Sequence, residues 1–161
     1  MAIPARVQQF LESRGARYDV VSHPRSVNSI HTADRADIHG DLLVKTVVLE
    51  DDDGMLLAIL PATRSVHIGH LAKELDQPLR LADERDLPSV FPDCSLGAIP
   101  PLGAAYGLRT ILDDTVEEQQ EVFFEAGDHE HLIHMTGAQF AALIDPAPRA
   151  HFSQAERRLH R

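Results

Sequence analysis

The alternation of apolar and polar positions is strongest between residues 41 and 60. Residues 41–50 form a short apolar, β-branched run that follows Gly40, which is typical of a β-strand. The Asp-Asp-Gly sequence at residues 52–54 predicts a hairpin turn, and residues 55–60 predict the returning strand. Because apolar residues occupy both alternating faces of the first strand, we expect both of its faces to be covered.

Lys45 interrupts this strand with a charge. A period of two places its side chain on the same face as Leu43, Val47 and Leu49, where an unpaired ammonium group is costly. The chain contains only one other lysine, Lys73, which lies on a predicted amphipathic helix. Lys45 either faces a pocket, where it binds an anion or polarises a carbonyl, or extends from an edge strand into solvent.

The rest of the pattern predicts helices and strands that are mixed along the chain. Helices are expected at residues 4–15, 28–36, 68–76, 84–90 and 136–145, and strands at residues 18–21, 78–82, 109–112, 121–125 and 131–135. Hairpins connect several of these strands. The pattern therefore predicts an α+β fold with a mixed, largely antiparallel sheet rather than a doubly wound parallel sheet.

The composition indicates one domain with an ordinary core. The chain has 161 residues, of which 43% are hydrophobic and 25% are charged. It has no apolar run of membrane-spanning length and no signal-peptide pattern at its start. Its single cysteine, Cys94, excludes an internal disulfide bond, so we expect a reducing, cytoplasmic setting.

The net charge of −10 argues against wide, non-specific binding of nucleic acid, including DNA, because such binding requires a basic surface. The charge is uneven, because residues 149–161 contain four arginines and one acidic residue. This basic C-terminal tail is either an arm that contacts RNA or a solvated chain end.

The ten histidines do not predict a metal site. His129, His131 and His134 form the densest group, but strand alternation separates them, and no cysteine pair or H-E-x-x-H motif accompanies them. The chain also has no glycine-rich nucleotide-binding motif and no G-x-S-x-G motif. Asp113 ends a predicted strand, where a carboxylate meets a ligand or caps a turn.

Residues 97–103 form a loop rich in glycine and proline. Glycines allow backbone N–H groups to approach a ligand, and prolines restrict the conformations of the loop. The loop is a candidate binding site for a carbonyl oxygen or an oxyanion, or else a structural turn.

These features occur in an order that resembles a known family. The matching elements are His23-Pro24, Leu43-Val44-Lys45-Thr46, Asp53-Gly54, Leu60-Pro61-Ala62, Leu81-Ala82, the G-x-x-x-P loop Gly97-Ala98-Ile99-Pro100-Pro101 with Gly103, Asp113, and Gly127. Over residues 4–145 the sequence resembles the YbaK/prolyl-tRNA-synthetase-associated domain family, which comprises free-standing aminoacyl-tRNA deacylases and the editing insertion of bacterial prolyl-tRNA synthetases.

The resemblance implies an editing domain at residues 1–148, with a curved, barrel-like sheet, followed by the basic tail at residues 149–161. The implied reaction is hydrolysis of the aminoacyl ester of a mischarged tRNA, with tRNA-Pro as one candidate substrate. The implied partners are aminoacyl-tRNA and prolyl-tRNA synthetase, with no cofactor, metal, membrane or DNA. A water molecule or the substrate's own 2′-hydroxyl would be the nucleophile.

The resemblance also implies a site in a pocket between the strand of Lys45 and the glycine-rich loop. Lys45 would be the catalytic residue and would hold a phosphate or the ester carbonyl, while backbone N–H groups of the loop would position the carbonyl oxygen. The implied substrate-binding residues are His23, Thr46, Gly97, Ala98, Ile99, Pro101, Gly103, Asp113 and His129.

The sequence departs from the alanine-specific branch of the family in one respect. That branch has asparagine directly after the lysine, whereas Thr46 is closer to the branch that removes cysteine. Two other hypotheses remain: a catalytically silent module that binds an amino acid, a nucleotide or a synthetase, and metal-dependent hydrolysis through the histidines.

Overall fold

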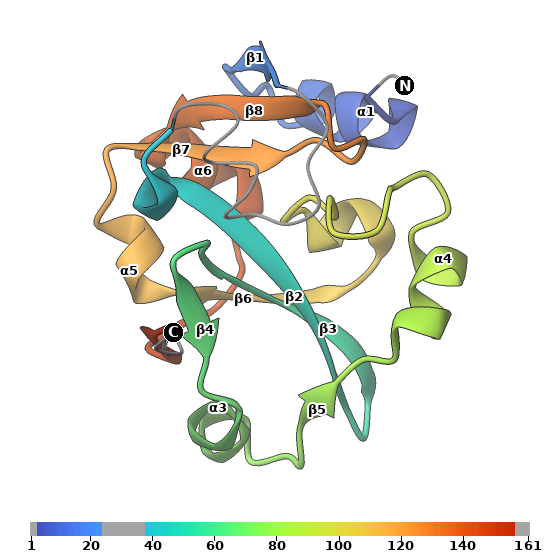
Figure 1. Ribbon diagram of the computed structural model, residues 1–161, viewed down its shortest axis with the longest axis vertical. Coiled ribbons are helices and arrows are strands. Elements are labelled where there is room, and N and C mark those ends of the chain that lie inside the picture. The colour runs from blue at the N-terminus through green and yellow to red at the C-terminus, as the bar shows by residue number, and fades with distance from the viewer. Residues whose placement is uncertain (1–2, 24–37, 157–161) are drawn as a thin grey trace, which may run out of the picture.

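The computed structural model describes residues 3–23 and 38–156 (Figure 1). The helix expected at residues 28–36 lies outside this part of the chain. Within the described residues, no helix is long and apolar enough to cross a membrane. The helices are α1 (Ala5–Ser13), α3 (Ile68–Leu75), α4 (Leu87–Val90), α5 (Asp114–Glu117) and α6 (Gly137–Ile144), with short 3-10 helices η1 (Gly40–Leu42), η2 (Glu84–Asp86) and η3 (Gly103–Tyr106).

The strands form one large mixed sheet and one small sheet. They are β1 (Asp19–Ser22), β2 (Leu43–Asp51), β3 (Gly54–Pro61), β4 (Arg64–Val66), β5 (Arg80–Leu81), β6 (Arg109–Asp113), β7 (Glu121–Glu125), β8 (His131–Thr136), β9 (Arg149–Ala150) and β10 (Ser153–Ala155). The large sheet has the order β1-β8-β7-β2-β3-β6-β9, and β5 also pairs with β2. The pairs β2–β7, β3–β6 and β6–β9 are parallel, and the other ladders of this sheet are antiparallel. The predicted α+β fold with a mixed sheet is confirmed, although the described strands do not close into a barrel.

Turn and cap residues explain where several of these elements begin and end. In the β2–β3 hairpin, the backbone N–H of Asp53 donates to the Asp51 carboxylate at 2.8 Å, and Gly54 adopts φ +117°, which favours glycine. The Thr136 hydroxyl accepts the backbone N–H of Gln139 at 3.1 Å and so caps α6. The hairpin and this cap follow the positions that the sequence predicts.

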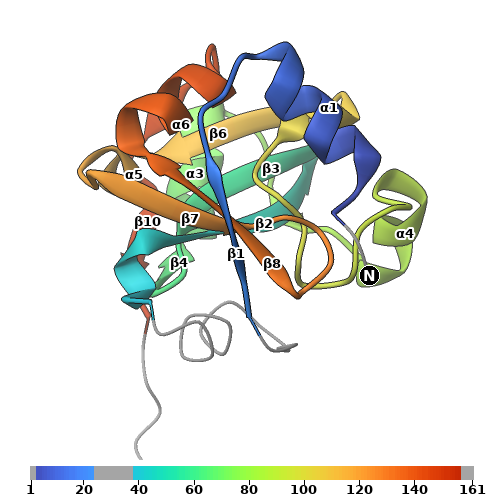
Figure 2. The same ribbon diagram turned by 90° about the horizontal axis from the view of Figure 1, so that it is seen from above.

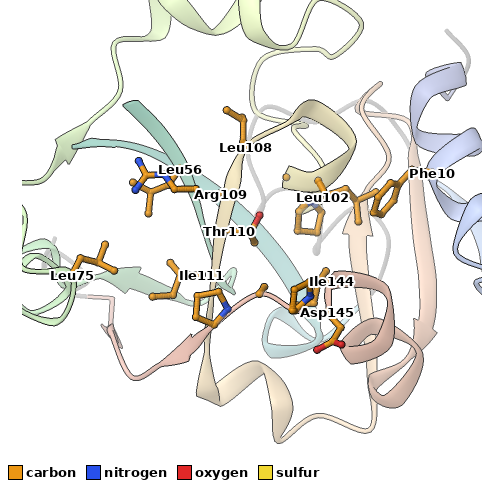
Figure 3. A pocket seen from close by; sticks show the side chains of 16 residues that line it. Phe10, Leu56, Leu75, Leu102, Leu108, Arg109, Thr110, Ile111, Ile144 and Asp145 are labelled. Carbon is orange, nitrogen blue, oxygen red and sulfur yellow. The ribbon is translucent and has the colours of Figure 1, made fainter. Parts of the chain in front are cut away.

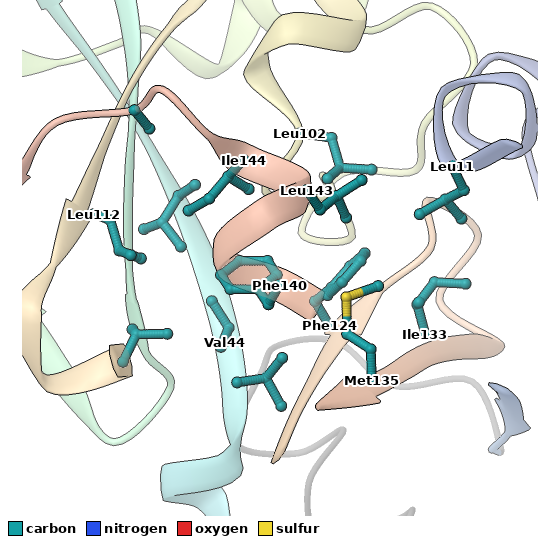
Figure 4. Close-up of a cluster of buried hydrophobic side chains, with 14 of the residues drawn as sticks. Leu11, Val44, Leu102, Leu112, Phe124, Ile133, Met135, Phe140, Leu143 and Ile144 are labelled. Carbon is teal, nitrogen blue, oxygen red and sulfur yellow. The ribbon is translucent and has the colours of Figure 1, made fainter. Parts of the chain in front are cut away.

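The core lies on both sides of β2, as the apolar pattern predicts. One side, the lysine face, carries Leu43, Lys45, Val47 and Leu49, and the opposite face carries Val44, Thr46 and Val48. Figure 4 shows the main core of the opposite face, where α6, β7 and β8 enclose Val44. On the lysine face, Leu49 belongs to a second cluster with residues of β3, α3 and the chain after β9.

The first residues of the predicted basic tail pack against the rest of the fold, as two short strands within residues 149–155. β9 extends the large sheet beside β6, and β10 pairs with β4 over residues 64–66. Phe152, between them, is 1% exposed and belongs to the core of the lysine face. Figure 2 shows β10 next to β4 on the side of the molecule away from α1. The sequence did not indicate these strands because each is only two or three residues long.

Candidate functional site

The candidate site lies where two parallel strands separate. β2 and β7 are paired only over residues 43–44 and 123–124; β7 then ends, while β2 continues beside β3. Figure 1 shows the two strands close together near η1 and diverging from there. The last residue pair between the two strands is Val44 with Phe124, and Lys45 and Glu125 are the next residues in β2 and β7. Strand alternation places both side chains on the lysine face, so they lie at the point of divergence.

Lys45 occupies this position with a half-buried ammonium group. It forms no hydrogen bond or ion pair with another described residue within 4 Å. Burial lowers the pKa of Lys45 below its ordinary value, and the negative charge of Glu156 opposes this shift in part. A desolvated cation of this kind is suited to binding an anionic or strongly polar group.

Thr46 projects from the other side of the same strand. It lies opposite Ile59 in the β2–β3 ladder, between Val44 and Val48 on the opposite face. Its hydroxyl oxygen is buried and has no hydrogen-bond partner among the described residues. The structure therefore separates Lys45 and Thr46 onto the two faces of β2, and leaves the Thr46 hydroxyl able to accept or donate a hydrogen bond.

The glycine- and proline-rich loop is attached to the tip of the β7–β8 hairpin. The backbone N–H of Ser95 donates to the Gly127 carbonyl oxygen at 2.7 Å, just before the loop. From there the loop reaches the opposite face of β2, where Ile99 packs against the cluster that contains Val48 and Phe91. The loop thus extends from the tip of the β7–β8 hairpin to the face of β2 opposite Lys45.

Only some of the loop's N–H groups are available to a ligand. Ala98 is buried, and its N–H donates to the Ser95 carbonyl oxygen at 3.1 Å. Pro100 and Pro101 have no N–H. The N–H groups of Gly97, which adopts φ +82°, and of Ile99 form no hydrogen bond with other described residues. Of the donors that the sequence suggested, these two remain.

Two predicted residues, His23 and His129, meet at a buried carboxylate that the sequence analysis did not select. Glu125 lies between them: one carboxylate oxygen is 3.1 Å from Nε2 of His23, and the other is 3.1 Å from Nδ1 of His129. Nε2 of His129 lies 2.5 Å from the carbonyl oxygen of Leu96, the residue before Gly97. These three side chains, each less than 8% exposed, connect β1, the β7–β8 hairpin and the start of the loop.

Gly103 and Asp113 hold parts of the fold together. A Cβ atom at Gly103 would lie 2.0 Å from the Thr110 hydroxyl oxygen and 2.8 Å from the Leu108 carbonyl oxygen, so no other residue fits there without rearrangement. Asp113 is completely buried. Its carboxylate accepts backbone N–H groups of Phe152 and Ser153, both at 2.8 Å, and the Ser153 hydroxyl at 2.7 Å.

The carboxylate of Asp113 also accepts two hydrogen bonds from Thr115, one from its backbone N–H and one from its hydroxyl. Burial alone would raise the pKa of Asp113, but these donors together lower it. Asp113 lies on the lysine face, with Leu60 of β3 between it and Lys45. Its carboxylate both caps the start of α5 through Thr115 and anchors the C-terminal segment through Phe152 and Ser153.

The other candidate groups each have a local structural partner. His131 lies 2.5 Å from Asp128, and His134 lies 2.9 Å from Glu121, so within the described residues His129, His131 and His134 do not converge on one point. The one described cluster with metal-ligand spacing is Asp113, Asp114 and His151, in which Asp113 is already occupied. Burial raises the pKa of Cys94 to about 12, which disfavours the reactive thiolate.

An apolar cavity of about 310 Å³ lies outside this site, between β6 and the segment that leads to β9 (Figure 3). Its walls include Phe10, Leu102, Ile111 and Ile144, and Pro101 and Gly103 are the only predicted site residues that line it. Neither Lys45 nor His129 contributes to it. This cavity is therefore separate from the pocket that the sequence predicted between the strand of Lys45 and the loop.

The described residues form a single α+β domain. A half-buried lysine without a close partner among these residues and a buried His–Glu–His set lie where β2 and β7 diverge. The nearby loop contributes two N–H groups that no other described residue binds. Comparison with protein families identifies the group to which such a domain belongs. The chain is a member of the aminoacyl-tRNA editing domain family, whose model matches residues 23–143. No curated protein matches the chain.

Solved structures share the fold over nearly the whole chain. A candidate trans-editing enzyme for prolyl tRNA synthetase has a TM-score of 0.80 at 24% identity, with 94% of this chain and 96% of that chain covered. A scaffold protein used for grafting linear epitopes by computational design has a TM-score of 0.80 at 22% identity, with 94% and 97% covered. A candidate signal transduction protein from Marinobacter aquaeolei VT8 has a TM-score of 0.75 at 29% identity, and this chain covers 31% of it.

Proposed function

We propose that this protein is an aminoacyl-tRNA deacylase that hydrolyses the ester of mischarged tRNA. The observation that carries the proposal is the position of Lys45, the one half-buried cation at the divergence of β2 and β7, in a chain that belongs to the editing-domain family. The substrate of such an enzyme presents phosphates and an ester carbonyl. Lys45 and the free loop N–H groups supply partners for both.

In this proposal, Lys45 holds the phosphate of the terminal nucleotide or the ester carbonyl oxygen. The N–H groups of Gly97 and Ile99 donate to the carbonyl oxygen, whose negative charge grows as the tetrahedral intermediate forms. Water adds to the carbonyl carbon, either of the original ester or of the 2′-ester that forms if the 2′-hydroxyl of the terminal ribose first takes over the acyl group. The bond from that carbon to the ribose oxygen then breaks, and hydrolysis releases a free amino acid and a tRNA with a free hydroxyl group.

This chemistry requires no side-chain nucleophile. Cys94 is the one cysteine of the chain, and its raised pKa keeps it in the thiol form at neutral pH. The proposed catalysis therefore depends on positioning and electrostatic stabilisation.

The preferred candidate substrate is mischarged tRNA-Pro, because one of the similar solved structures is described as a candidate trans-editing enzyme for prolyl tRNA synthetase. The choice of amino acid would depend on the size and polarity of the pocket. One methylene group changes discrimination by only about 1–3 kcal/mol.

A panel of mischarged tRNAs, each carrying a labelled amino acid, tests the proposal. The wild-type protein should release the amino acid from at least one of them faster than buffer alone does, and correctly charged tRNA-Pro is the control for specificity. Absence of hydrolysis across the panel would contradict the deacylase proposal. Tight binding of an aminoacyl-adenosine analogue without turnover would instead support the silent binding module.

A further inference from the structure

We propose that Glu125 is a positioning residue of the editing site, which fixes the start of the 97–101 loop through the imidazole of His129. The inference deepens the proposed function and rests on it. Glu125 ends β7, faces the same side of the sheet as Lys45 and is 4% exposed. A carboxylate this deeply buried must be hydrogen-bonded, and both of its oxygens have an imidazole partner at 3.1 Å.

The hydrogen bonds of His129 define which ring nitrogen carries a proton. The Leu96 carbonyl oxygen can only accept, so Nε2 of His129 must be the protonated donor in that contact. Nδ1 then faces the Glu125 carboxylate, and the proton between these two atoms belongs to either partner. Glu125 thereby holds the ring in the orientation in which Nε2 reaches the Leu96 carbonyl oxygen.

The loop contact matters because it immediately precedes the candidate donors. Leu96 is followed by Gly97, whose N–H is available, and the next free N–H is that of Ile99. Leu96 and Gly97 are exposed, so little packing holds this turn. The hydrogen bond from His129 to Leu96 and the bond from the Ser95 N–H to the Gly127 carbonyl oxygen hold it to the β7–β8 hairpin. A displacement of the turn would move the donors away from a bound ester carbonyl.

His129 itself occupies an uncommon backbone conformation, which is consistent with a positional role. Its φ of +63° lies in the left-handed region, and its side chain is 4% exposed. The buried pair with Glu125 offsets the cost of this conformation.

Two substitutions separate the positioning role from a general role in folding. Glu125→Ala removes both hydrogen bonds, whereas Glu125→Gln retains an amide that donates to Nδ1 of His129 and so preserves the protonated Nε2. Glu121→Gln is the matched control, because Glu121 is in the same strand and pairs with His134 at 2.9 Å but does not contact the loop.

Amide hydrogen exchange of residues 94–99, followed by mass spectrometry, tests the inference independently of activity. We expect Glu125→Ala to accelerate exchange in this peptide by about tenfold or more, and Glu125→Gln and Glu121→Gln to leave it near the wild-type rate. Unchanged exchange in a folded Glu125→Ala protein would overturn the inference, as would equal acceleration in Glu125→Gln. Because no substrate is present, this readout remains decisive even if no mischarged tRNA is hydrolysed.

Single-turnover deacylation then links the position of the loop to catalysis. A misplaced oxyanion donor should lower the rate for Glu125→Ala by about 10²-fold while tRNA affinity stays unchanged, with recovery in Glu125→Gln. A rate equal to that of the wild type would contradict the catalytic part of the inference. If Glu125→Ala does not fold, nitrogen NMR of His129 in the wild-type protein decides: a protonated Nε2 supports the inference, and an unprotonated Nε2 overturns it.

Discussion

Lys45 combines an unfavourable environment with the absence of a close partner among the described residues. Burial lowers its pKa, so the folded protein carries this charge at an energetic cost. Buried ionisable groups with shifted pKa values concentrate at functional sites, where the cost is retained for binding or chemistry. The residue therefore should be dispensable for folding and necessary for activity.

Lys45→Met tests this expectation. The deacylation rate should fall by about 10²-fold or more, because a charge that stabilises the transition state is lost. The free energy of unfolding at pH 7 should stay equal or rise by up to about 1 kcal/mol, since an apolar side chain replaces a desolvated ammonium group. Lys73→Met is the control, because Lys73 is exposed on α3.

The pH dependence of the same variant has a defined sign. A lysine whose pKa is lowered on folding binds fewer protons in the folded state, so its destabilising effect is present at neutral pH. This effect disappears as the pH rises through the lowered pKa toward 10.5. The stability advantage of Lys45→Met should therefore shrink at alkaline pH, and the activity of the wild type should decline there. A strong loss of stability in Lys45→Met at pH 7 would contradict this account.

Asp113, unlike Lys45, is a buried charged residue whose hydrogen-bonding partners are all present in the fold. Its carboxylate accepts five hydrogen bonds, three of them from Phe152 and Ser153 in the C-terminal segment. Asp113→Asn places an amide N–H against at least one donor, so the free energy of unfolding should fall by about 1–3 kcal/mol. Urea denaturation measures this change.

The activity of Asp113→Asn distinguishes an anchoring role from the substrate-binding role that the sequence suggested. If Asp113 only anchors the segment, the variant that remains folded should deacylate at nearly the wild-type rate. Asp114→Asn is the control, because Asp114 is an exposed neighbour paired with His151. A large loss of activity in Asp113→Asn without loss of stability would support contact with the substrate.

At the scale of elements, an ion pair at the tip of the β2–β3 hairpin reinforces the parallel ladder between β3 and β6. The guanidinium of Arg109 forms two hydrogen bonds with the buried Asp51 carboxylate, at 2.9 and 2.7 Å, and a third with the Gly54 carbonyl oxygen at 3.1 Å. The side-chain hydrogen bonds from Arg109 are the main cause of the lowered pKa of Asp51. The hairpin that carries Lys45 is thus fixed at its far end.

Arg109→Gln should lower the free energy of unfolding by about 1–2 kcal/mol at pH 7, because it leaves a buried carboxylate with fewer donors. This loss of stability is small for a buried carboxylate, because Arg109 is half-exposed and solvent screens its charge. Since the pKa of Asp51 is lowered in the folded protein, its contribution is present above pH 4 and is lost as the pH falls through the folded value.

Thermal unfolding from pH 7 to pH 3 measures this dependence. The difference in stability between wild type and Arg109→Gln should diminish as the medium becomes acidic. Arg85→Gln provides the comparison, because the Arg85–Asp83 pair is exposed and should have no measurable effect. A constant difference at all pH values would exclude Asp51 as the partner responsible.

The sequence predicted the elements that have their own pattern. β2, β3 and α3 show clear apolar periodicity, and the caps at Asp83 and Thr136 act as their residue types suggested. β4, β9 and β10 could not be predicted, because strands of two or three residues exist only through their partners in the folded chain.

The same limit applies to the site. Lys45 was conspicuous because it broke an apolar pattern, but Glu125 was not, since glutamate at a strand end is common on protein surfaces. The one sequence feature that favoured a buried Glu125 was its position two residues after Phe123, which places both side chains on the same face of β7. The contact with His23 depends on the pairing of β1 with β8 and on the turn after β7, neither of which short-range spacing defines.

At the scale of the whole molecule, charge opposes the proposed substrate. The protein carries a net charge of −10, so tRNA phosphates are repelled by most of its surface. The basic residues of the C-terminal segment do not all remain available to compensate. Arg149 lies in β9 and contacts Glu117 at 3.3 Å, which leaves Arg157, Arg158 and Arg161, beyond the described residues.

These three arginines are therefore the best candidates for tRNA contacts at the end of the chain. Removing residues 149–161 would also remove β9 and β10, so substitution is a cleaner experiment than deletion. Each phosphate contact changes the slope of log affinity against log salt concentration by about 0.7–0.9. Replacing all three arginines by glutamine should reduce that slope by about 2 and weaken tRNA binding at low salt.

The measurement is tRNA affinity by fluorescence anisotropy between 50 and 200 mM salt, the range over which counterion release is readily measured. Arg80→Gln is the control, because Arg80 is an exposed arginine on β5 that pairs with Glu50, outside the tail. If the triple variant retains the wild-type slope, the tail does not contact tRNA. The acidic body would then require a second protein to bring the substrate to Lys45, and a synthetase bound to mischarged tRNA has the chemistry to do so.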